Sequence, residues 1–389
     1  MQSGAARKAT PVPRPQLFLF LSTEMLPTRR RPLPWHLLLL RRSKTTSAQH
    51  VAARHRDPTF EKFMDSYKHY LKALPIVDLI ISSPDHTLPL SFLSTSLSQR
   101  LHLNRGPLHF IRAFPHLFSI SSDKPFIVTL TPAAQSVLSS ESEASSRESE
   151  AATCRLHRLL AMSLSHRLPL RAVFRVWREL GLPDDFEHSV IHQNPSLFSL
   201  SDNPNEPNTH IVELVDTGSK NFTPAIESWR RSLQKDSSFE FNLRFPPGMR
   251  LTKDYRARIK AWQLVPYTGP YEPCTTRGSG KNGRRMMEKR AVGIMHEFIS
   301  LTVEKMVEVE KISHFKKWFG IELNVRDLFL DHPGIFYLST KGYRHTVFLR
   351  EAYEKGRLIE PNPIYDARRR LLDLMLLRRR GIGSLTNNH

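Results

Sequence analysis

The apolar and polar positions of this chain repeat one pattern three times. The copies read LHLNRGPLHFIRAFPHLFSI at 101–120, LGLPDDFEHSVIHQNPSLFSL at 180–200 and FGIELNVRDLFLDHPGIFYLS at 319–339. Each has an apolar triplet, a short amphipathic stretch, a proline and then an aromatic run typical of a strand. The proline comes 14, 15 and 14 residues after the start of its copy. A repeat of this length usually reflects a repeated structural unit.

The flanks extend each copy to three helices followed by two strands. Before the first copy, apolar residues recur at helical spacing through 57–82, and a second short helix follows. Pro107 suits the first turn of a third helix. Pro115 ends that helix, because the residue before a proline avoids the α region. Two short apolar runs, 116–120 and 125–132, then predict a β-hairpin.

The second and third copies repeat this order. In the third, Asn324 is expected to cap the helix that precedes the proline. We therefore predict a mainly α protein with short β-hairpins (α+β), built from tandem winged-helix-like units. The alternative is an all-α helical repeat in which the strand assignments are wrong.

This interpretation divides the chain into six segments. They are an organelle transit peptide and disordered lead at 1–56, a first unit at 57–138, a polar acidic linker at 139–150, a second unit at 151–216, a basic and aromatic connecting segment with a linker at 217–290, and a third unit with a C-terminal basic helix at 291–381. The linker SSESEASSRESE is expected to be flexible because it is polar and acidic. The end of the connecting segment, 275–290, is expected to be disordered.

Charge adds a functional direction. Lys and Arg outnumber Asp and Glu by 57 to 37, a net charge of +20. Residues 1–56 carry 11 cations and one acid, so half of the excess belongs to the rest of the chain. A chain this basic favours a polyanionic partner, most often nucleic acid.

The N-terminal segment is rich in Arg, Ser and Thr and nearly free of acids, as organelle-targeting peptides are. The segment that begins at Met25 would itself serve as a mitochondrial presequence, so Met1 and Met25 both remain candidate start sites. Its arginines favour the mitochondrion over the chloroplast. No run reaches 18 apolar residues, and we expect no membrane partner.

The sequence gives no support to an enzyme, a cofactor or a metal. The two cysteines, Cys154 and Cys274, lie in no metal-binding or redox motif. GSGKNG at 278–283 is not a phosphate-binding loop, because Asn282 stands where a hydroxyl must bind magnesium. No catalytic motif or small-molecule site is evident.

Four groups of residues are candidates for contact with RNA. The first lies between aromatic residues and comprises Arg244, Arg250, Lys253, Arg256, Arg258 and Lys260. The others are Arg284 and Arg285, the third hairpin turn with Lys341, Tyr343 and Arg344, and the C-terminal Arg368, Arg369 and Arg370. Cations among aromatics suit single-stranded RNA, whose bases stack on rings while its phosphates meet the charges. The alternative at each place is a solvated charge, or an aromatic such as Trp262 in the core.

Several stretches resemble one family. They are RDPTFEKFM at 56–64, LPLSFLSTSLSQRLHLNRGPLHFIRAFPHLFSI at 88–120, FNLRFPPGMRLTKDYRARIKAWQLVPYTGPYE at 241–272, and DHPGIFYLSTKGYRHTVFLREAYEKGRLIEPNPIYDARRRLLDLMLLRRR at 331–380. This ordered set is similar to the plant organelle RNA recognition domain family, the What's This Factor and Root Primordium Defective group.

The resemblance implies a non-enzymatic plant protein that binds organellar RNA and promotes group II intron splicing, in mitochondria or chloroplasts, with other splicing factors as further candidate partners. It supplies no catalytic or base-reading residues to carry over.

Three other readings stay open. One is a nucleic-acid-binding helical-repeat protein like the mitochondrial termination factors. The intervals of 80 and 138 residues between the repeated prolines count against its regular spacing. The second is a protein adaptor in an organellar ribonucleoprotein. A hydrolase is the third, and it would need a Cys154 or Cys274 nucleophile.

Overall fold

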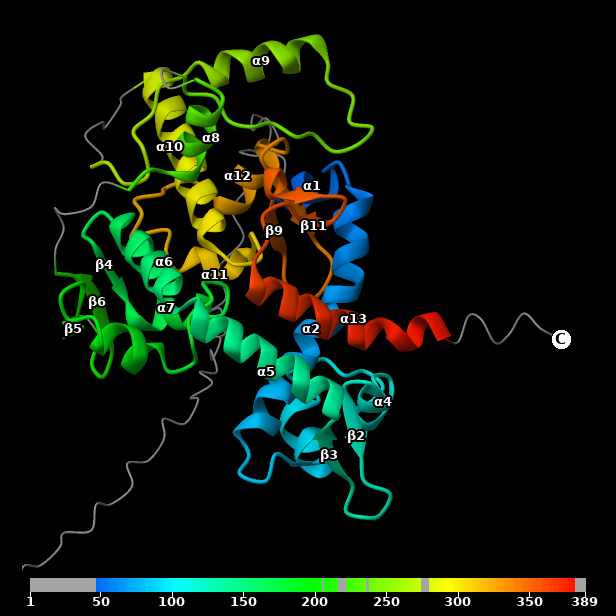
Figure 1. The fold of residues 1–389 in the computed structure, drawn as a ribbon. Coiled ribbons are helices and arrows are strands. Elements are labelled where there is room, and N and C mark those ends of the chain that lie inside the picture. The colour runs from blue at the N-terminus through cyan, green and yellow to red at the C-terminus, as the bar shows by residue number, and fades with distance from the viewer. Residues whose placement is uncertain (1–46, 205, 216–221, 236–237, 274–279, 382–389) are drawn as a thin grey trace, which may run out of the picture. The chain divides into compact units, whose positions relative to one another are not determined.

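The computed structural model describes residues 47–204, 206–215, 222–235, 238–273 and 280–381 (Figure 1). All of them fall in the second of two compact units, Thr46–His389. The predicted transit peptide therefore lies outside the described residues, apart from its last ten positions.

Three segments share one order of elements, which is helix, strand, two short helices and two strands. The first repeat, 58–130, comprises α2 (Pro58–Ser82), β1 (Leu88–Pro89), α3 (Leu90–Phe92) continued by η2 (Leu93–Leu97), α4 (Pro107–Arg112), β2 (Phe118–Ile120) and β3 (Ile127–Leu130). The second repeat, 149–214, comprises α6 (Ser149–Ala161), β4 (Arg167–Pro169), α7 (Leu170–Val176), η3 (Glu187–His192), β5 (Phe198–Asp202) and β6 (His210–Leu214). The third repeat, 280–349, comprises α10 (Gly280–Leu301), β7 (Met306–Glu308), α11 (Val309–Ser313), α12 (Val325–Asp331), β8 (Phe336–Ser339) and β9 (Thr346–Leu349).

Each repeat closes on a three-stranded antiparallel sheet. The strand orders are β1-β3-β2, β4-β6-β5 and β7-β9-β8, so the last strand of each repeat is central. In the third sheet Val347 pairs with both Val307 and Leu338. The predicted mixture of helices and short hairpins is confirmed, and the all-α alternative is wrong.

Local signals in the sequence account for several of these elements. Pro107 opens α4, and the Asn324 side chain accepts from the Arg326 N–H at 3.0 Å to cap α12, as predicted. The first strand of each repeat was not predicted. At two or three residues these strands are too short to show an alternating pattern.

The remaining elements connect or cover the repeats. They are α1 (Ser47–Ala52), α5 (Pro132–Arg147), α8 (Ala225–Ser232), α9 (Lys253–Gln263), η4 (Arg350–Ala352), β10 (Tyr353–Glu354), β11 (Arg357–Leu358) and α13 (Pro363–Gly381). Throughout the described ranges, no helix combines the length and the apolar content needed to cross a membrane.

The prediction of a flexible linker at 139–150 is wrong, because this stretch lies in α5 and α6. The Thr131 hydroxyl caps α5 by accepting from the Ala134 N–H at 3.2 Å. Ala144 is buried, and the Glu141 carboxylate accepts from Arg368 of α13 at 2.8 Å. The acidic residues that suggested a solvated loop therefore include an internal counter-ion.

The expectation of a disordered lead up to residue 56 also needs correction. Residues 47–52 form α1, and the Arg54 side chain is only 8% exposed. Its guanidinium donates to the Leu338 carbonyl at 3.0 Å and to the Thr340 hydroxyl at 2.7 Å. These contacts fix the residues just before α2 against the third repeat.

Two hydrophobic cores join the repeats. The first packs Phe186 of the second repeat with Phe298 and Phe319 of the third. The second packs Met64 of the first repeat with Phe348 of the third, and it includes leucines of α13. Because both cores draw on the third repeat, the three repeats are packed together.

Candidate nucleic-acid interface

Helix α9 is the most exposed regular element of the basic connecting segment. It begins after Thr252, whose hydroxyl accepts from the Tyr255 N–H at 3.2 Å. None of its residues is buried. Its inner side is a half-buried stripe of Tyr255, Ile259 and Trp262, spaced i, i+4, i+7. The helix therefore rests on the protein through these three side chains and through Gln263, whose amide bonds the Phe241 backbone, and it leaves the rest of its surface open.

The outer side of α9 carries uncompensated positive charge. Lys253, Arg256 and Lys260 follow one another at i, i+3, i+7, so they share one side of the helix, and all three are exposed. Exposed Arg258 lies over the Tyr255 ring at 5.5 Å, and Arg250 is exposed just before the helix.

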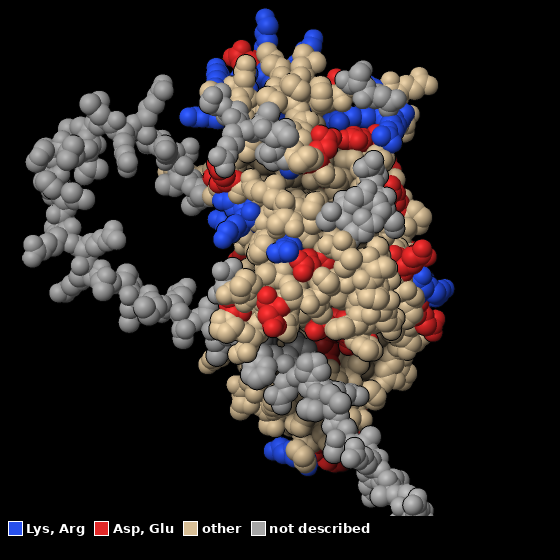
Figure 2. Space-filling view, turned by 90° about the vertical axis from the view of Figure 1, so that its left-hand side faces the viewer, with Lys and Arg blue, Asp and Glu red and all other residues tan. Residues whose placement is uncertain are grey.

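Within the described residues, none of these five cations forms an ion pair. In the space-filling view, Lys and Arg gather at the top, the end at which Figure 1 places α9 (Figure 2).

A buried lysine of α10 holds the other end of α9. The Lys289 ammonium donates to the carbonyls of Trp262, Gln263 and Val265, at 3.0, 2.7 and 2.7 Å. The carbonyls of Trp262 and Gln263 belong to the last turn of α9, and that of Val265 lies just beyond it. A cation at this end adds hydrogen bonds to the terminal carbonyls and interacts favourably with the helix dipole. Burial lowers the pKa of Lys289 to about 7, and nearby Arg230 adds to this effect.

The start of α10 adds two more cations. Arg284 and Arg285 lie slightly more than one turn before Lys289, and both are exposed. Neither has an ion-pair partner in the part of the chain that the structure describes. The two arginines therefore precede, by four and five residues, the lysine that contacts the end of α9.

The expectation of disorder at 275–290 is therefore wrong for 280–290, the part of this segment that the structure describes. Residues 280–290 are helical, and Lys289 and Arg290 are buried in structural contacts. Arg290 donates to the Gly269 carbonyl at 2.5 Å. Positions 275–279 lie outside the described residues.

Arg244 differs from the cations of α9 because it is hydrogen-bonded to another part of the protein. Its side chain is exposed but donates to the Tyr353 carbonyl at 3.3 Å, while its own carbonyl accepts from Arg350. It links the connecting segment to η4 and β10, which directly follow the third repeat.

The third hairpin turn is largely neutralised. The Lys341 ammonium lies 3.2 Å from the Asp65 carboxylate. Arg344 pairs with Glu308 at 3.5 Å and Glu310 at 3.0 Å. Tyr343, by contrast, is 75% exposed. The expected cluster of free cations at this turn is therefore absent among the described residues, and the tyrosine is the turn's open side chain.

The three C-terminal arginines have three different environments. Arg368 is only 6% exposed, and its guanidinium donates to Glu141 and to the Arg178 carbonyl. Arg369 is half-buried over the Phe63 ring at 5.4 Å. Arg370 is exposed. Arg368 was predicted to contact RNA, but it is a structural residue instead, because burial and pairing leave its guanidinium no open face for a phosphate.

Through Lys289, the structure thus joins α9 to the helix that carries Arg284 and Arg285. Lys289, which positions this surface, was missed because its role depends on carbonyls more than twenty residues away. Among the described residues, no group of three or more metal-binding side chains is present. The arrangement is suited to binding a polyanion.

Comparison with known proteins identifies one family along most of the chain. The family model described as the plant organelle RNA recognition domain matches residues 55–380. No solved structure matches the chain.

Individual relatives agree with that match. Protein ROOT PRIMORDIUM DEFECTIVE 1 of Arabidopsis thaliana is 36% identical over 356 residues, which cover 86% of each chain. Protein WHAT'S THIS FACTOR 1, chloroplastic, of Zea mays is 30% identical over 332 residues, which cover 82% of this chain and 65% of that protein. Protein WHAT'S THIS FACTOR 9, mitochondrial, of Arabidopsis thaliana is 28% identical over 337 residues, which cover 82% of this chain and 84% of that protein. This chain therefore belongs to the plant organelle RNA recognition domain family.

Proposed function

We propose that this protein binds organellar RNA and promotes the splicing of group II introns without catalysing a reaction itself. The observation that carries the proposal is the exposed stripe of Lys253, Arg256 and Lys260 on α9, which no carboxylate of the described residues neutralises. A protein that binds the folded form of an intron and not its unfolded forms stabilises that fold by mass action.

The charge distribution supports α9 over the other predicted contacts. The cations of the third hairpin turn and Arg368 already have carboxylate partners. A phosphate would have to displace those partners, whereas on α9 it displaces only water and counterions. The half-buried ring of Tyr255 beside the cations offers some stacking surface to unpaired bases. Trp262 does not, because its ring packs against Phe241, His332 and the Lys289 ammonium.

We further propose that the three repeats are winged-helix-like. The order of their elements, and a sheet in which the last strand is central, support this. The interface nevertheless lies on α9, between the second and third repeats in sequence.

The proposed location is the mitochondrion, with the chloroplast as the alternative. The family is one of plant organelles, and its members include a relative named as mitochondrial and another named as chloroplastic. The arginine-rich N-terminal segment favours the mitochondrion.

The salt dependence of RNA binding tests the α9 surface. The full chain is titrated with a labelled single-stranded 30-nucleotide RNA from a group II intron at several salt concentrations. The variant Arg256→Gln/Lys260→Gln should bind more weakly, and its slope of log affinity against log salt should be shallower by about 1 per cation removed. The control Lys317→Gln/Arg357→Gln removes the same charge from exposed positions elsewhere.

An equal loss in both double variants would show that only net charge matters. If neither the wild type nor the variants bind RNA, but the protein co-purifies with splicing proteins, the adaptor reading replaces this proposal.

A further inference from the structure

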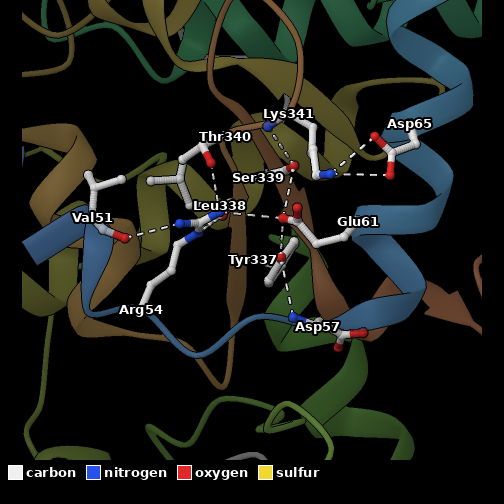
Figure 3. A network of polar contacts seen from close by, with 10 residues as sticks. All are labelled: Val51, Arg54, Asp57, Glu61, Asp65, Tyr337, Leu338, Ser339, Thr340 and Lys341. Carbon is white, nitrogen blue, oxygen red and sulfur yellow. Dashed lines mark hydrogen bonds and ion pairs between the residues drawn. The ribbon is translucent and has the colours of Figure 1, made fainter.

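The tip of the third hairpin is held in place by the first repeat. Figure 3 shows the network between β8 and α2. Glu61 of α2 accepts from the Tyr337 hydroxyl at 2.5 Å and from the Ser339 hydroxyl at 3.2 Å. On the other side of β8, Arg54 binds Leu338 and Thr340. Four consecutive residues, 337–340, are thus tied to residues before and within α2.

The ion pair of Lys341 extends this network into the turn. Its ammonium reaches both oxygens of Asp65, one turn along α2 from Glu61 (Figure 3). Asp65 also accepts from Lys68 at 2.9 Å, and these two lysines hold the pKa of its carboxyl below the usual value. The turn that carries Tyr343 is therefore fixed before any ligand arrives.

Tyr343 itself takes no part in the core. Its side chain is 75% exposed, the most exposed large hydrophobic residue among those that the structure describes. Its ring lies on the ring of His102 from the first repeat, with centroids 4.4 Å apart and planes inclined by 32°. One side of the tyrosine is thus supported by a second ring, and most of its surface is open to solvent.

The surroundings of this ring pair are positively charged. The Lys72 ammonium donates to the His102 carbonyl at 2.8 Å, a neutral acceptor that leaves its charge uncompensated. Partial burial lowers the pKa of Lys72, and Lys68 adds to this effect. Arg100 and Arg105 flank His102 in sequence and are exposed, without ion pairs in the described residues. The sequence contains no acid from 86 to 122.

We propose that Tyr343, supported by His102, is a stacking platform for an unpaired RNA base, and that Lys72 binds a neighbouring phosphate. This inference rests on the proposed function and gives it a second site, distinct from α9. An aromatic face without sequence-specific donors accepts any base, because every base has a π-face. The nearby cations have no carboxylate partners, so they favour a negatively charged ligand such as RNA.

The two rings of this site belong to residues 241 positions apart in the sequence. They meet only because the first repeat packs against the third. A preformed ring pair loses little conformational freedom on binding, so stacking energy is retained as affinity.

The test compares a single-stranded RNA with its duplex. The full chain, as wild type, Tyr343→Phe and Tyr343→Ala, is titrated with a labelled 20-nucleotide oligouridylate and with a blunt 20-base-pair RNA duplex. Tyr343→Ala should weaken oligouridylate binding by about fivefold or more, because a stacked base contributes at least that much affinity. Tyr343→Phe keeps the ring and should stay within about twofold of wild type, and duplex binding should not change with either variant.

A second variant removes the supporting ring. His102 has a positive φ of 49°, a conformation that asparagine tolerates well, so His102→Asn should preserve the backbone. It should weaken oligouridylate binding in the same direction as Tyr343→Ala.

The platform is refuted if Tyr343→Ala binds oligouridylate like wild type, or if it loses single-stranded and duplex binding equally. A wild-type chain that binds no RNA at all would instead overturn the proposed function. If the α9 variant loses affinity while Tyr343→Ala does not, the proposed function stands without the platform.

Discussion

Arginines of this basic chain serve two opposite purposes, and position in the fold decides which. Arg256 and Arg258 are exposed on α9, whereas Arg368 is buried between Glu141 and Glu304. Glu304 is itself buried and accepts from the Tyr67 hydroxyl at 2.8 Å. The guanidinium thus links α13 to α5, to the second repeat through the Arg178 carbonyl and to the third through Glu304, which in turn bonds Tyr67 of the first.

Removal of that guanidinium should therefore lower the stability of the folded protein. In Arg368→Met, the buried carboxylate of Glu304 and the half-buried carboxylate of Glu141 lose their cation, and we expect the free energy of unfolding to fall by about 3–5 kcal/mol. Urea unfolding followed by circular dichroism measures it. Arg370→Met, two residues further along the same helix and exposed, is the control and should change stability by no more than about 0.5 kcal/mol. Equal effects of the two substitutions would contradict the structural role of Arg368.

Lys289 gives a prediction that depends on pH. Its pKa is 10.5 in the unfolded chain and about 7 in the folded protein. Between these values the unfolded chain holds a proton that the folded protein has released, so the free energy of unfolding rises with pH. The stability of the wild type relative to Lys289→Met should therefore increase above pH 7, by up to about 1.4 kcal/mol per pH unit.

Urea unfolding at pH 6.5 and pH 8.5 checks this difference. Lys281→Met, an exposed substitution near the start of α10, is the control for the loss of one lysine. A stability difference for Lys289→Met that is the same at both pH values would contradict the assigned burial effect.

At the scale of elements, α9 depends on its two ends. An isolated helix of 11 residues is marginal in water, so the cap at Thr252 and the lysine at its far end decide how fully it forms. Thr252→Ala removes the cap and should cost the helix about 1 kcal/mol. We expect faster amide exchange within 253–263 and weaker RNA binding.

A matched substitution separates capping from stability in general. Thr131→Ala removes the corresponding cap of α5, which lies outside the proposed interface. It should lower stability by a similar amount and leave RNA affinity unchanged. Loss of RNA affinity in Thr131→Ala but not in Thr252→Ala would rule out α9 as the binding element.

Elements also show where sequence patterns suffice. The start of α4 at Pro107 and the cap of α12 at Asn324 depend on neighbouring residues, and both were predicted. The helix at 139–150 was not, because Glu141 meets its cation 227 residues away. Composition alone describes such a residue as solvated.

The candidate site follows the same division. The basic character of 250–260 is visible in the sequence, and so is the helical spacing of its cations. Which cations remain unpaired is not visible, since the partners of Lys341 and Arg344 lie in other elements. Likewise, nothing near His102 in the sequence indicates that Tyr343 lies on its ring.

At the scale of the whole molecule, the shared cores predict cooperative unfolding. The tryptophans of the described residues are Trp177, Trp229, Trp262 and Trp318, and none is in the first repeat. Met64 is fully buried in the core that joins the first repeat to the third. Met64→Ala should lower stability by about 2–5 kcal/mol, and the tryptophan fluorescence transition should shift to lower urea together with circular dichroism.

Independent repeats would behave differently. The fluorescence midpoint would then stay at its wild-type value while only part of the circular dichroism signal moved. That result would contradict the joint packing on which the His102–Tyr343 platform also depends.

We propose that exposed cations of α9 bind intron RNA in an organelle. The most direct test of this proposal is ultraviolet crosslinking in purified mitochondria and chloroplasts, followed by sequencing of the RNA bound to wild type, to Arg256→Gln/Lys260→Gln and to the control Lys317→Gln/Arg357→Gln. We expect group II intron sequences to be enriched with the wild type and the control, and strongly reduced with the α9 variant. Absence of intron RNA from the wild-type samples of both organelles, or equal enrichment with all three proteins, would contradict it.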